Sequence, residues 1–223
     1  MSGTGLEAVL ARLRAAEAAA GRPVGAVNLL AASKQQSADT IRATAARGQR
    51  VYGENYVQEA LPKMAALADL DLSWHFIGRL QRNKTRDVAA HFDWLHTLDR
   101  ADFARRLSDQ RPAGRPPLQV LIEVNVSGEA TKGGVAAEDV AAVADEVRRL
   151  PGLTLRGLMC LPAPETDPAR QRAAFARLRA ILLALDDPAL DTLSMGTSGD
   201  LEAAVAEGAT IVRVGTALFG ARA

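Results

Sequence analysis

Short apolar runs alternate with longer segments of helical periodicity along almost the whole chain of 223 residues. The segments of helical periodicity are rich in Ala, Leu, Arg and Glu and suit amphipathic helices outside a sheet, as at 136–150 and 168–185. Eight apolar runs predict strands, at 26–33, 51–54, 74–78, 94–98, 118–126, 154–159, 192–195 and 211–215. Such alternation is typical of parallel strands joined by crossover helices. Eight units in this length predict a (β/α)8 TIM barrel.

An amphipathic helix over 5–20 is predicted before the first strand. Leu6, Val9 and Leu13 recur there at helical spacing, and Gly21 ends the pattern. The fold class predicted from the sequence is therefore α/β, a single (β/α)8 barrel with an extra N-terminal helix. A doubly wound open sheet is the alternative, but no Gly-x-Gly-x-x-Gly turn follows the first predicted strand.

We expect residues 1–223 to form one domain. A chain of this length with 48% hydrophobic residues can bury a large core. The Pro- and Gly-rich stretch RPAGRPP at 111–117 has the composition of a linker, but its seven residues are more simply read as a loop before the fifth strand. A closed barrel has no exposed sheet edge, so a monomer is expected.

Charge and cysteine content exclude several classes of partner and environment. There are 27 Lys and Arg residues against 26 Asp and Glu, so a net charge of +1 favours neither nucleic acid nor a membrane surface as a partner. The single Cys160 cannot form an intramolecular disulfide, and the N-terminal residues do not match a secretory signal. We therefore expect a cytoplasmic protein. We also expect no metal site, because no His, Cys and acidic residues stand at metal-ligand spacing.

Reactive and polar residues follow several predicted strands. Lys34 follows the first, Asn55 the second, Ser198 the seventh, and Gly215 and Thr216 the eighth. In a barrel these positions share the face that carries the chemistry. Two of them have a purely structural alternative: Lys34 as a solvated lysine at a strand end, and Ser198 as the N-cap of the next helix.

A lysine on this face, together with a phosphate site, fits one kind of cofactor. An amine becomes a better nucleophile where a poorly solvated site or a neighbouring cation favours its neutral form. The loops after strands seven and eight are the usual phosphate site of a barrel, where Ser198, Gly215 and Thr216 supply hydroxyls and close backbone approach. Lys34 and these loops together indicate pyridoxal 5′-phosphate. A Schiff-base aldolase with a phosphosugar substrate would use the same groups without a cofactor.

Arg213 is unusual because the predicted strand IVRVG is otherwise apolar. If it faces the barrel interior, its guanidinium can lie beside the pyridine nitrogen of the cofactor and disfavour protonation there. Arginine in that position weakens the electron sink and implies restricted chemistry. The alternative is a salt bridge near the end of the barrel.

Six segments carry a resemblance that runs nearly end to end: SK at 33–34, YGENYVQEA at 52–60, WHFIGRLQRNK at 74–84, RGLMCLPAP at 156–164, LSMGTSGDLEAAVAEG at 193–208 and VRVGTALFGAR at 212–222. They closely resemble the pyridoxal phosphate homeostasis proteins, single-barrel relatives of the N-terminal domain of alanine racemase. The resemblance implies that Lys34 is the Schiff-base lysine and that Asn55 lines its pocket. Ser198, Gly215 and Thr216 would hold the phosphate, and Arg213 would face the ring nitrogen.

The resemblance also implies a role without amino-acid turnover and without catalytic residues. The family binds pyridoxal 5′-phosphate and acts in its intracellular homeostasis as a carrier or buffer of the reactive aldehyde, with cofactor-dependent apoenzymes as partners. A racemase-like enzyme is the alternative. Because the sequence ends at Ala223, after the last predicted strand, we expect no second domain to supply a second base. Lys132 after the fifth strand is either a second lysine for the aldehyde or an exposed lysine in a Gly-rich loop.

Overall fold

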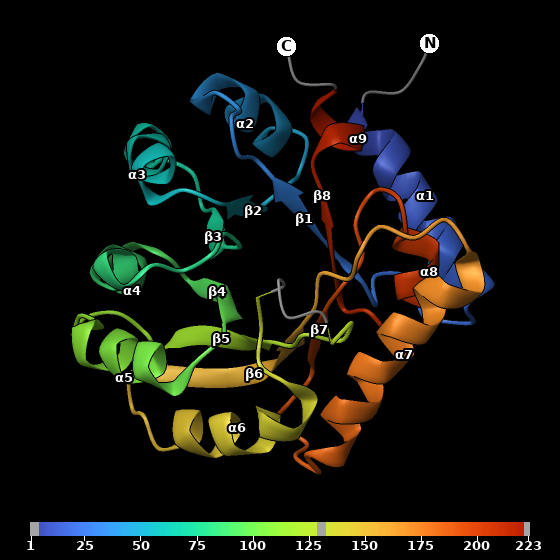
Figure 1. Cartoon of the computed structure of the whole chain (residues 1–223). Helices are drawn as coiled ribbons and strands as arrows, with labels where there is room; N and C mark the ends of the chain where they lie inside the picture. Colours follow the sequence, from blue (N-terminus) through green and yellow to red (C-terminus); the bar gives the residue numbers. More distant parts are fainter. Residues whose placement is uncertain (1–4, 129–132, 221–223) are drawn as a thin grey trace.

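The computed structural model describes residues 5–128 and 133–220. Eight parallel strands form a closed barrel in sequence order, with the last strand paired to the first (Figure 1). The strands are β1 Asn28–Ala32, β2 Val51–Glu54, β3 Ser73–Phe76, β4 Trp94–Leu98, β5 Leu118–Glu123, β6 Leu153–Met159, β7 Thr192–Ser194 and β8 Ile211–Val214.

Helices surround the barrel on its outside (Figure 1). They are α1 Gly5–Ala19, α2 Ala38–Ala45, α3 Val57–Ala66, α4 Thr85–His91, α5 Ala101–Gln110, α6 Val140–Arg148, α7 Pro168–Ala184, α8 Leu201–Ala206 and α9 Thr216–Phe219. Two short 3-10 helices, η1 Arg82–Lys84 and η2 Ala137–Asp139, precede α4 and α6.

The predicted fold class is confirmed. Each of the eight predicted runs overlaps a strand, and the pairing of β1 with β8 excludes an open sheet. The extra N-terminal helix is α1, which packs against α8 and α9 through a face that buries Leu6, Val9 and Leu13. Helix α1 therefore covers the side of the barrel where β8 pairs with β1.

The fifth strand is shorter than predicted. It ends at Glu123 rather than at 126, and Val124 makes an isolated bridge to Val135. Farther along the chain, Gly128 and Gly134 have positive φ, 69° and 107°, a conformation that glycine adopts without steric cost. The strand therefore ends before the apolar sequence does, since Val124 and Val126 remain buried beyond it.

Alternating side chains of each strand define an interior and an outer layer. Leu30 and Gly53 face the interior, where a Cβ on Gly53 would lie 2.3 Å from Leu30 Cδ2. Tyr52 faces outward and its hydroxyl lies 2.8 Å from the hydroxyl of Thr44 on α2. The apolar core consequently lies mainly between the strands and the helices.

Gly78 brings the end of β3 against the end of β2. A Cβ at this buried position would lie 2.0 Å from the backbone oxygen of Asn55. Glycine is therefore required for this close approach, which sets the position of the Asn55 backbone.

We expect Gly78→Ala to lower the free energy of unfolding by about 2 to 3 kcal/mol, because two backbone segments must separate to admit a methyl group. Urea denaturation followed by circular dichroism measures the change. Gly114→Ala is the matched control, since a Cβ there meets nothing within 4 Å. Equal midpoints for the two variants would contradict the close approach.

Candidate functional site

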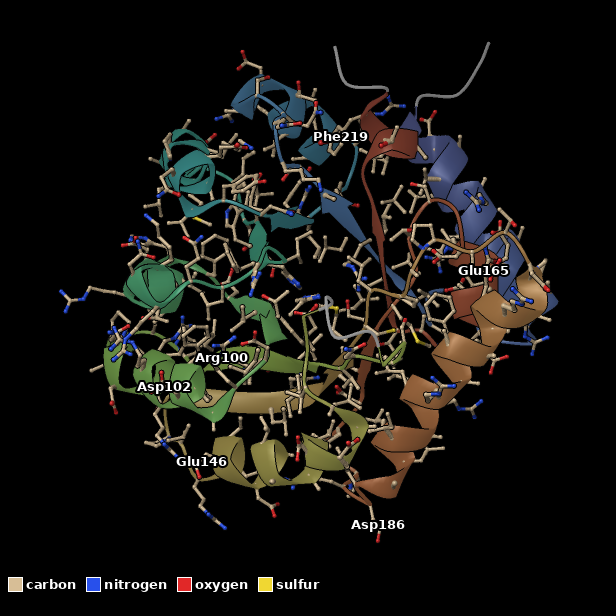
Figure 2. All side chains as sticks on the ribbon, in the orientation of Figure 1. Arg100, Asp102, Glu146, Glu165, Asp186 and Phe219 are labelled. Carbon is tan, nitrogen blue, oxygen red and sulfur yellow. The ribbon has the colours of Figure 1, made fainter. Side chains whose placement is uncertain are left out.

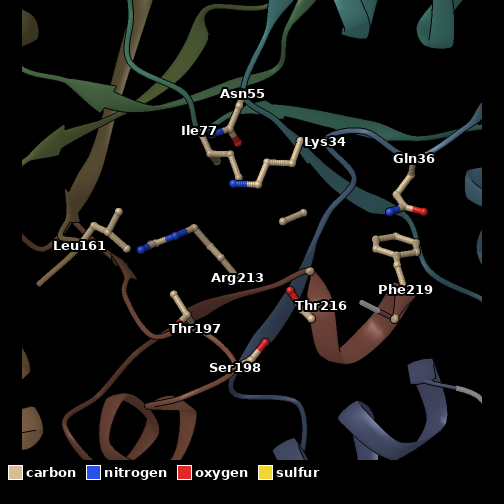
Figure 3. A pocket seen from close by; sticks show the side chains of 13 residues that line it. Lys34, Gln36, Asn55, Ile77, Leu161, Thr197, Ser198, Arg213, Thr216 and Phe219 are labelled. Atoms are coloured by element: carbon tan, nitrogen blue, oxygen red, sulfur yellow. The ribbon is translucent and has the colours of Figure 1, made fainter. Parts of the chain in front are cut away.

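A pocket of about 330 Å³ opens where the carboxyl ends of the first, second, seventh and eighth strands meet. The structure brings all six predicted site residues together in its wall (Figure 3). The lining residues are Ala32, Lys34, Gln36, Asn55, Ile77, Leu161, Thr197, Ser198, Arg213, Gly215, Thr216, Phe219 and Gly220. The individual roles expected for the six stay predictions.

One side of the pocket carries nitrogen-rich side chains. Lys34 lies two residues beyond β1, and its side chain extends into the same space as those of Asn55 and Arg213 (Figure 3). Asn55 Oδ1 is buried, and the described residues offer it no hydrogen-bond partner. An unsatisfied buried amide oxygen is costly, so a ligand that donates a hydrogen bond here would relieve that cost.

The other side of the pocket carries hydroxyl groups and a helix start. The hydroxyls of Ser198 and Thr216 lie on the same side in Figure 3. Gly215 is the N-cap of α9, where helix geometry leaves the first backbone amides without intrahelical partners. A Cβ on Gly215 would lie 3.2 Å from the carbonyl oxygen of Ala32, so the backbone passes β1 closely here. Hydroxyls and free amides of this kind suit an anionic group.

The loop that carries Ser198 is fixed from two directions. Arg12 of α1 donates to the Ser198 carbonyl oxygen at 2.7 Å. Asp200 Oδ1 accepts from the backbone amide and the hydroxyl of Thr197, at 2.6 and 2.8 Å. The expectation that Ser198 caps the next helix is wrong, because α8 begins at Leu201 with Asp200 in the N-cap position. Ser198 therefore keeps its hydroxyl free of that role.

Arg12 was not predicted as part of the site. It stands 186 residues before Ser198 in the sequence, on a helix whose pattern indicates only an amphipathic face. No local motif identifies such a contact, which arises because α1 packs beside α8 and α9.

Arg213 lies in the barrel interior with 8% of its surface exposed. Its Nη1 donates to the backbone and hydroxyl oxygens of Ser194, at 2.8 and 2.7 Å, and its Nη2 donates to the Cys160 carbonyl at 2.9 Å. Across the described ranges, no carboxylate reaches ion-pair distance of this guanidinium, so the alternative of a salt bridge is not what the structure shows. Burial lowers its pKa, but arginine stays charged in proteins.

A buried chain of hydrogen bonds runs from Arg213 across the barrel. Ser194 Oγ lies 2.8 Å from His96 Nδ1, His96 Nε2 lies 2.8 Å from His75 Nδ1, and His75 Nε2 lies 3.1 Å from Ser73 Oγ. A guanidinium only donates, so Ser194 Oγ accepts from Arg213, and its remaining hydrogen and lone pair allow it to donate to His96 or to accept from it. The chain therefore links Arg213 to Ser73 through the two imidazoles.

Both imidazoles are neutral in the folded protein. Burial lowers the pKa of His75 to about 3. Burial also lowers the pKa of His96 well below its ordinary value, helped by the neighbouring His75 and the charge of Arg213. The guanidinium consequently remains the cation at this end of the interior.

We expect the free energy of unfolding to fall by about 2.5 kcal/mol between pH 7 and pH 5.5 from these two histidines. Their pKa values are depressed in the folded state, so the stabilisation is present above the unfolded value and is lost as the pH falls. Denaturant titrations at several pH values measure the slope.

His75→Asn should halve that pH dependence, since one buried imidazole is removed. His91→Asn removes an exposed imidazole of α4 and serves as the matched control. A slope that is the same in both variants would contradict a neutral buried pair.

Two other expectations concern absences. Within 5–128 and 133–220 there is no group of three or more His, Cys, Asp or Glu residues that could hold a metal ion. No helix in the same ranges is both long and apolar enough to cross a bilayer. Lys132, considered as a second lysine for the aldehyde, lies outside the described residues.

A closed barrel with a lysine, an interior arginine and an anion site in one pocket matches a known class of domain. The family model described as alanine racemase, N-terminal domain, matches residues 5–223. Among curated proteins, the pyridoxal phosphate homeostasis protein of Pseudomonas aeruginosa is 60% identical over 214 residues, covering 96% of this chain and 93% of that protein. That of Escherichia coli K12 is 48% identical over 216 residues, covering 95% of this chain and 92% of that protein.

Solved structures are also similar to this chain. PipY of Synechococcus elongatus with pyridoxal phosphate bound superposes with a TM-score of 0.81 at 38% identity, covering 93% of this chain and 98% of that chain. Alanine racemase of Corynebacterium glutamicum shares the fold, with a TM-score of 0.67 at 18% identity, covering 96% of this chain and 60% of that chain. The chain belongs to the pyridoxal phosphate homeostasis proteins, within the family of the alanine racemase N-terminal domain.

Proposed function

We propose that residues 1–223 form one domain that binds pyridoxal 5′-phosphate through Lys34. The observation that carries this proposal is the convergence, in one pocket, of a lysine amine, a buried guanidinium and an anion site. The PipY structure, which has the same fold at 38% identity and contains pyridoxal phosphate, supports it.

The residues present fit the chemistry of this group. The amine of Lys34 would condense with the aldehyde of the cofactor, forming a C=N bond and releasing the aldehyde oxygen as water. Ser198 and Thr216 supply hydroxyl donors for the phosphate, and Gly215 lets the backbone amides of α9 approach it. Asn55, with its unsatisfied buried oxygen, lies where a donor on the ligand would be bound.

Arg213 determines which chemistry this site favours. The cofactor, when bound, withdraws electrons from an amino-acid carbon most strongly when its ring nitrogen is protonated. Arg213 presents a cation, held by Ser194 and Cys160, which disfavours a proton on a neighbouring nitrogen. The site therefore suits binding of the aldehyde better than turnover of an amino acid.

We infer a role in intracellular homeostasis of the cofactor, as a carrier or buffer of its reactive aldehyde. The curated relatives carry the name pyridoxal phosphate homeostasis protein and are not named as enzymes. Apoenzymes that use the cofactor are the partners proposed for transfer. We place the protein in the cytoplasm as a monomer, since it has one buried cysteine and a barrel without sheet edges.

Wild-type protein mixed with pyridoxal 5′-phosphate should show a visible absorbance band that Lys34→Ala lacks. Borohydride reduction followed by peptide mapping should locate the adduct on Lys34. Lys84→Ala in η1 is the control, because that lysine is absent from the pocket wall and should leave the band unchanged.

Other outcomes separate the alternatives. A wild-type protein that stays colourless would contradict the proposal and favour a cofactor-free Schiff-base aldolase. Steady conversion of an L-amino acid to its enantiomer by the coloured protein would favour a racemase-like enzyme over a carrier.

A further inference from the structure

The turn that carries Lys34 is held in an uncommon backbone conformation. Gln35, the next residue, has φ of 63°, in the left-handed region that side chains other than glycine and asparagine seldom adopt. Such a conformation persists only where surrounding contacts fix it. The direction in which Lys34 leaves the backbone depends on those contacts.

Two side chains of α3 bind the peptide groups on either side of Lys34. Lys63 Nζ donates to the carbonyl oxygen of Ser33 at 2.9 Å, which belongs to the peptide group before Lys34. Glu59 Oε2 accepts from the backbone amide of Gln35 at 3.1 Å, which belongs to the peptide group after it. Glu59 and Lys63 lie one helical turn apart and are themselves paired at 4.0 Å.

Glu54, the last residue of β2, supports these contacts through hydrogen bonds to Lys63 and Ser33. It is fully buried, and its Oε1 accepts from Lys63 Nζ at 2.9 Å and from the Ser33 hydroxyl at 2.6 Å. Burial raises the pKa of Glu54, and its hydrogen bonds to Ser33 and Lys63 oppose that rise. Buried charges of this kind are kept where they are paired and hydrogen-bonded.

The position of Lys63 separates it from the proposed Schiff-base lysine. Its side chain is only 11% exposed, and its ammonium is engaged by Ser33 and Glu54. It is absent from the lining of the 330 Å³ pocket, which contains Lys34. Lys63 therefore acts on the backbone that presents the reactive amine.

We propose that Glu59 and Lys63, supported by Glu54, are positioning residues that hold the Ser33–Gln35 turn so that the Lys34 amine meets the aldehyde of the cofactor. This inference rests on the proposed function. It assigns to α3 a role that the pocket lining does not reveal, because neither side chain lines the pocket.

The test compares two ligands that differ only in the aldehyde. Pyridoxal 5′-phosphate reports on ring, phosphate and covalent contacts together, measured by the rate and midpoint of the visible band. Pyridoxine 5′-phosphate has the ring and phosphate without an aldehyde, and its dissociation constant is measured by calorimetry. If these residues act by positioning Lys34, their substitution changes the rate and midpoint of the band with pyridoxal 5′-phosphate. The dissociation constant of pyridoxine 5′-phosphate then stays close to that of the wild type.

Glu59→Ala removes the acceptor for the Gln35 amide. It should slow formation of the visible band and raise the pyridoxal 5′-phosphate concentration at its midpoint about tenfold. Its affinity for pyridoxine 5′-phosphate should change less than twofold. Glu59→Gln keeps an acceptor oxygen and should restore most of the rate. Lys63→Met should have a larger effect of the same kind.

Asp69→Asn is the matched control, because it breaks the exposed Arg42–Asp69 pair beyond the end of α3 and leaves the turn alone. Lys63→Met also leaves Glu54 buried without its cation, so it is liable to unfold. In that event Glu59→Ala, whose side chain is partly exposed, carries the test.

Band formation in Glu59→Ala at the wild-type rate would overturn the inference while leaving the proposed function intact. An equal loss of affinity for both ligands would also overturn it, since that pattern indicates general damage to the pocket. Absence of the band in wild type, by contrast, would overturn the proposed function and this inference with it.

Discussion

The pairing of β1 with β8 is the constraint on which the site depends. Leu30 is in register with Arg213, and Ala31 with Val214, so the first and last strands of the chain run side by side. Lys34 emerges two residues beyond β1, and Gly215 directly follows β8. Residues separated by most of the sequence thus face one pocket because the sheet closes, and an open sheet of the same strands would leave them at opposite edges.

The two sides of the pocket are supported in different ways. Arg213 projects from a strand and is fixed by oxygens of β7 and of the segment after β6, so its position follows from the barrel itself. Lys34 and Ser198 lie on loops, where the barrel alone does not set their conformation. Side chains from neighbouring helices supply the missing restraint, Glu59 and Lys63 at the first loop and Arg12 at the second. The helices α1 and α3 therefore contribute to the site without lining it.

Sequence patterns predicted the fold, and they placed six residues of one pocket at or near strand ends, because strand runs and strand ends have local signals. Apolar runs of strand length gave the order of the barrel, and strand ends gave Lys34, Asn55 and Thr216. Patterns of this kind did not locate the end of β5, since Val124 and Val126 are as apolar as the strand before them. Contacts between distant helices and loops have no local signature either. Short sequence segments therefore do not predict the contacts of Arg12, Glu59 and Lys63 with the loops of the pocket.

Ser73 and His75 also line a second hollow, at the amino-terminal mouth of the barrel, together with Asn28 and Arg156. The hydrogen-bond chain that begins at Arg213 ends there. The opposite mouth is thus connected to the face that carries the 330 Å³ pocket by a chain of buried hydrogen bonds. A substitution at Ser73 or His75 would therefore change the hydrogen bonding behind Arg213 although neither residue lines the pocket that contains Lys34.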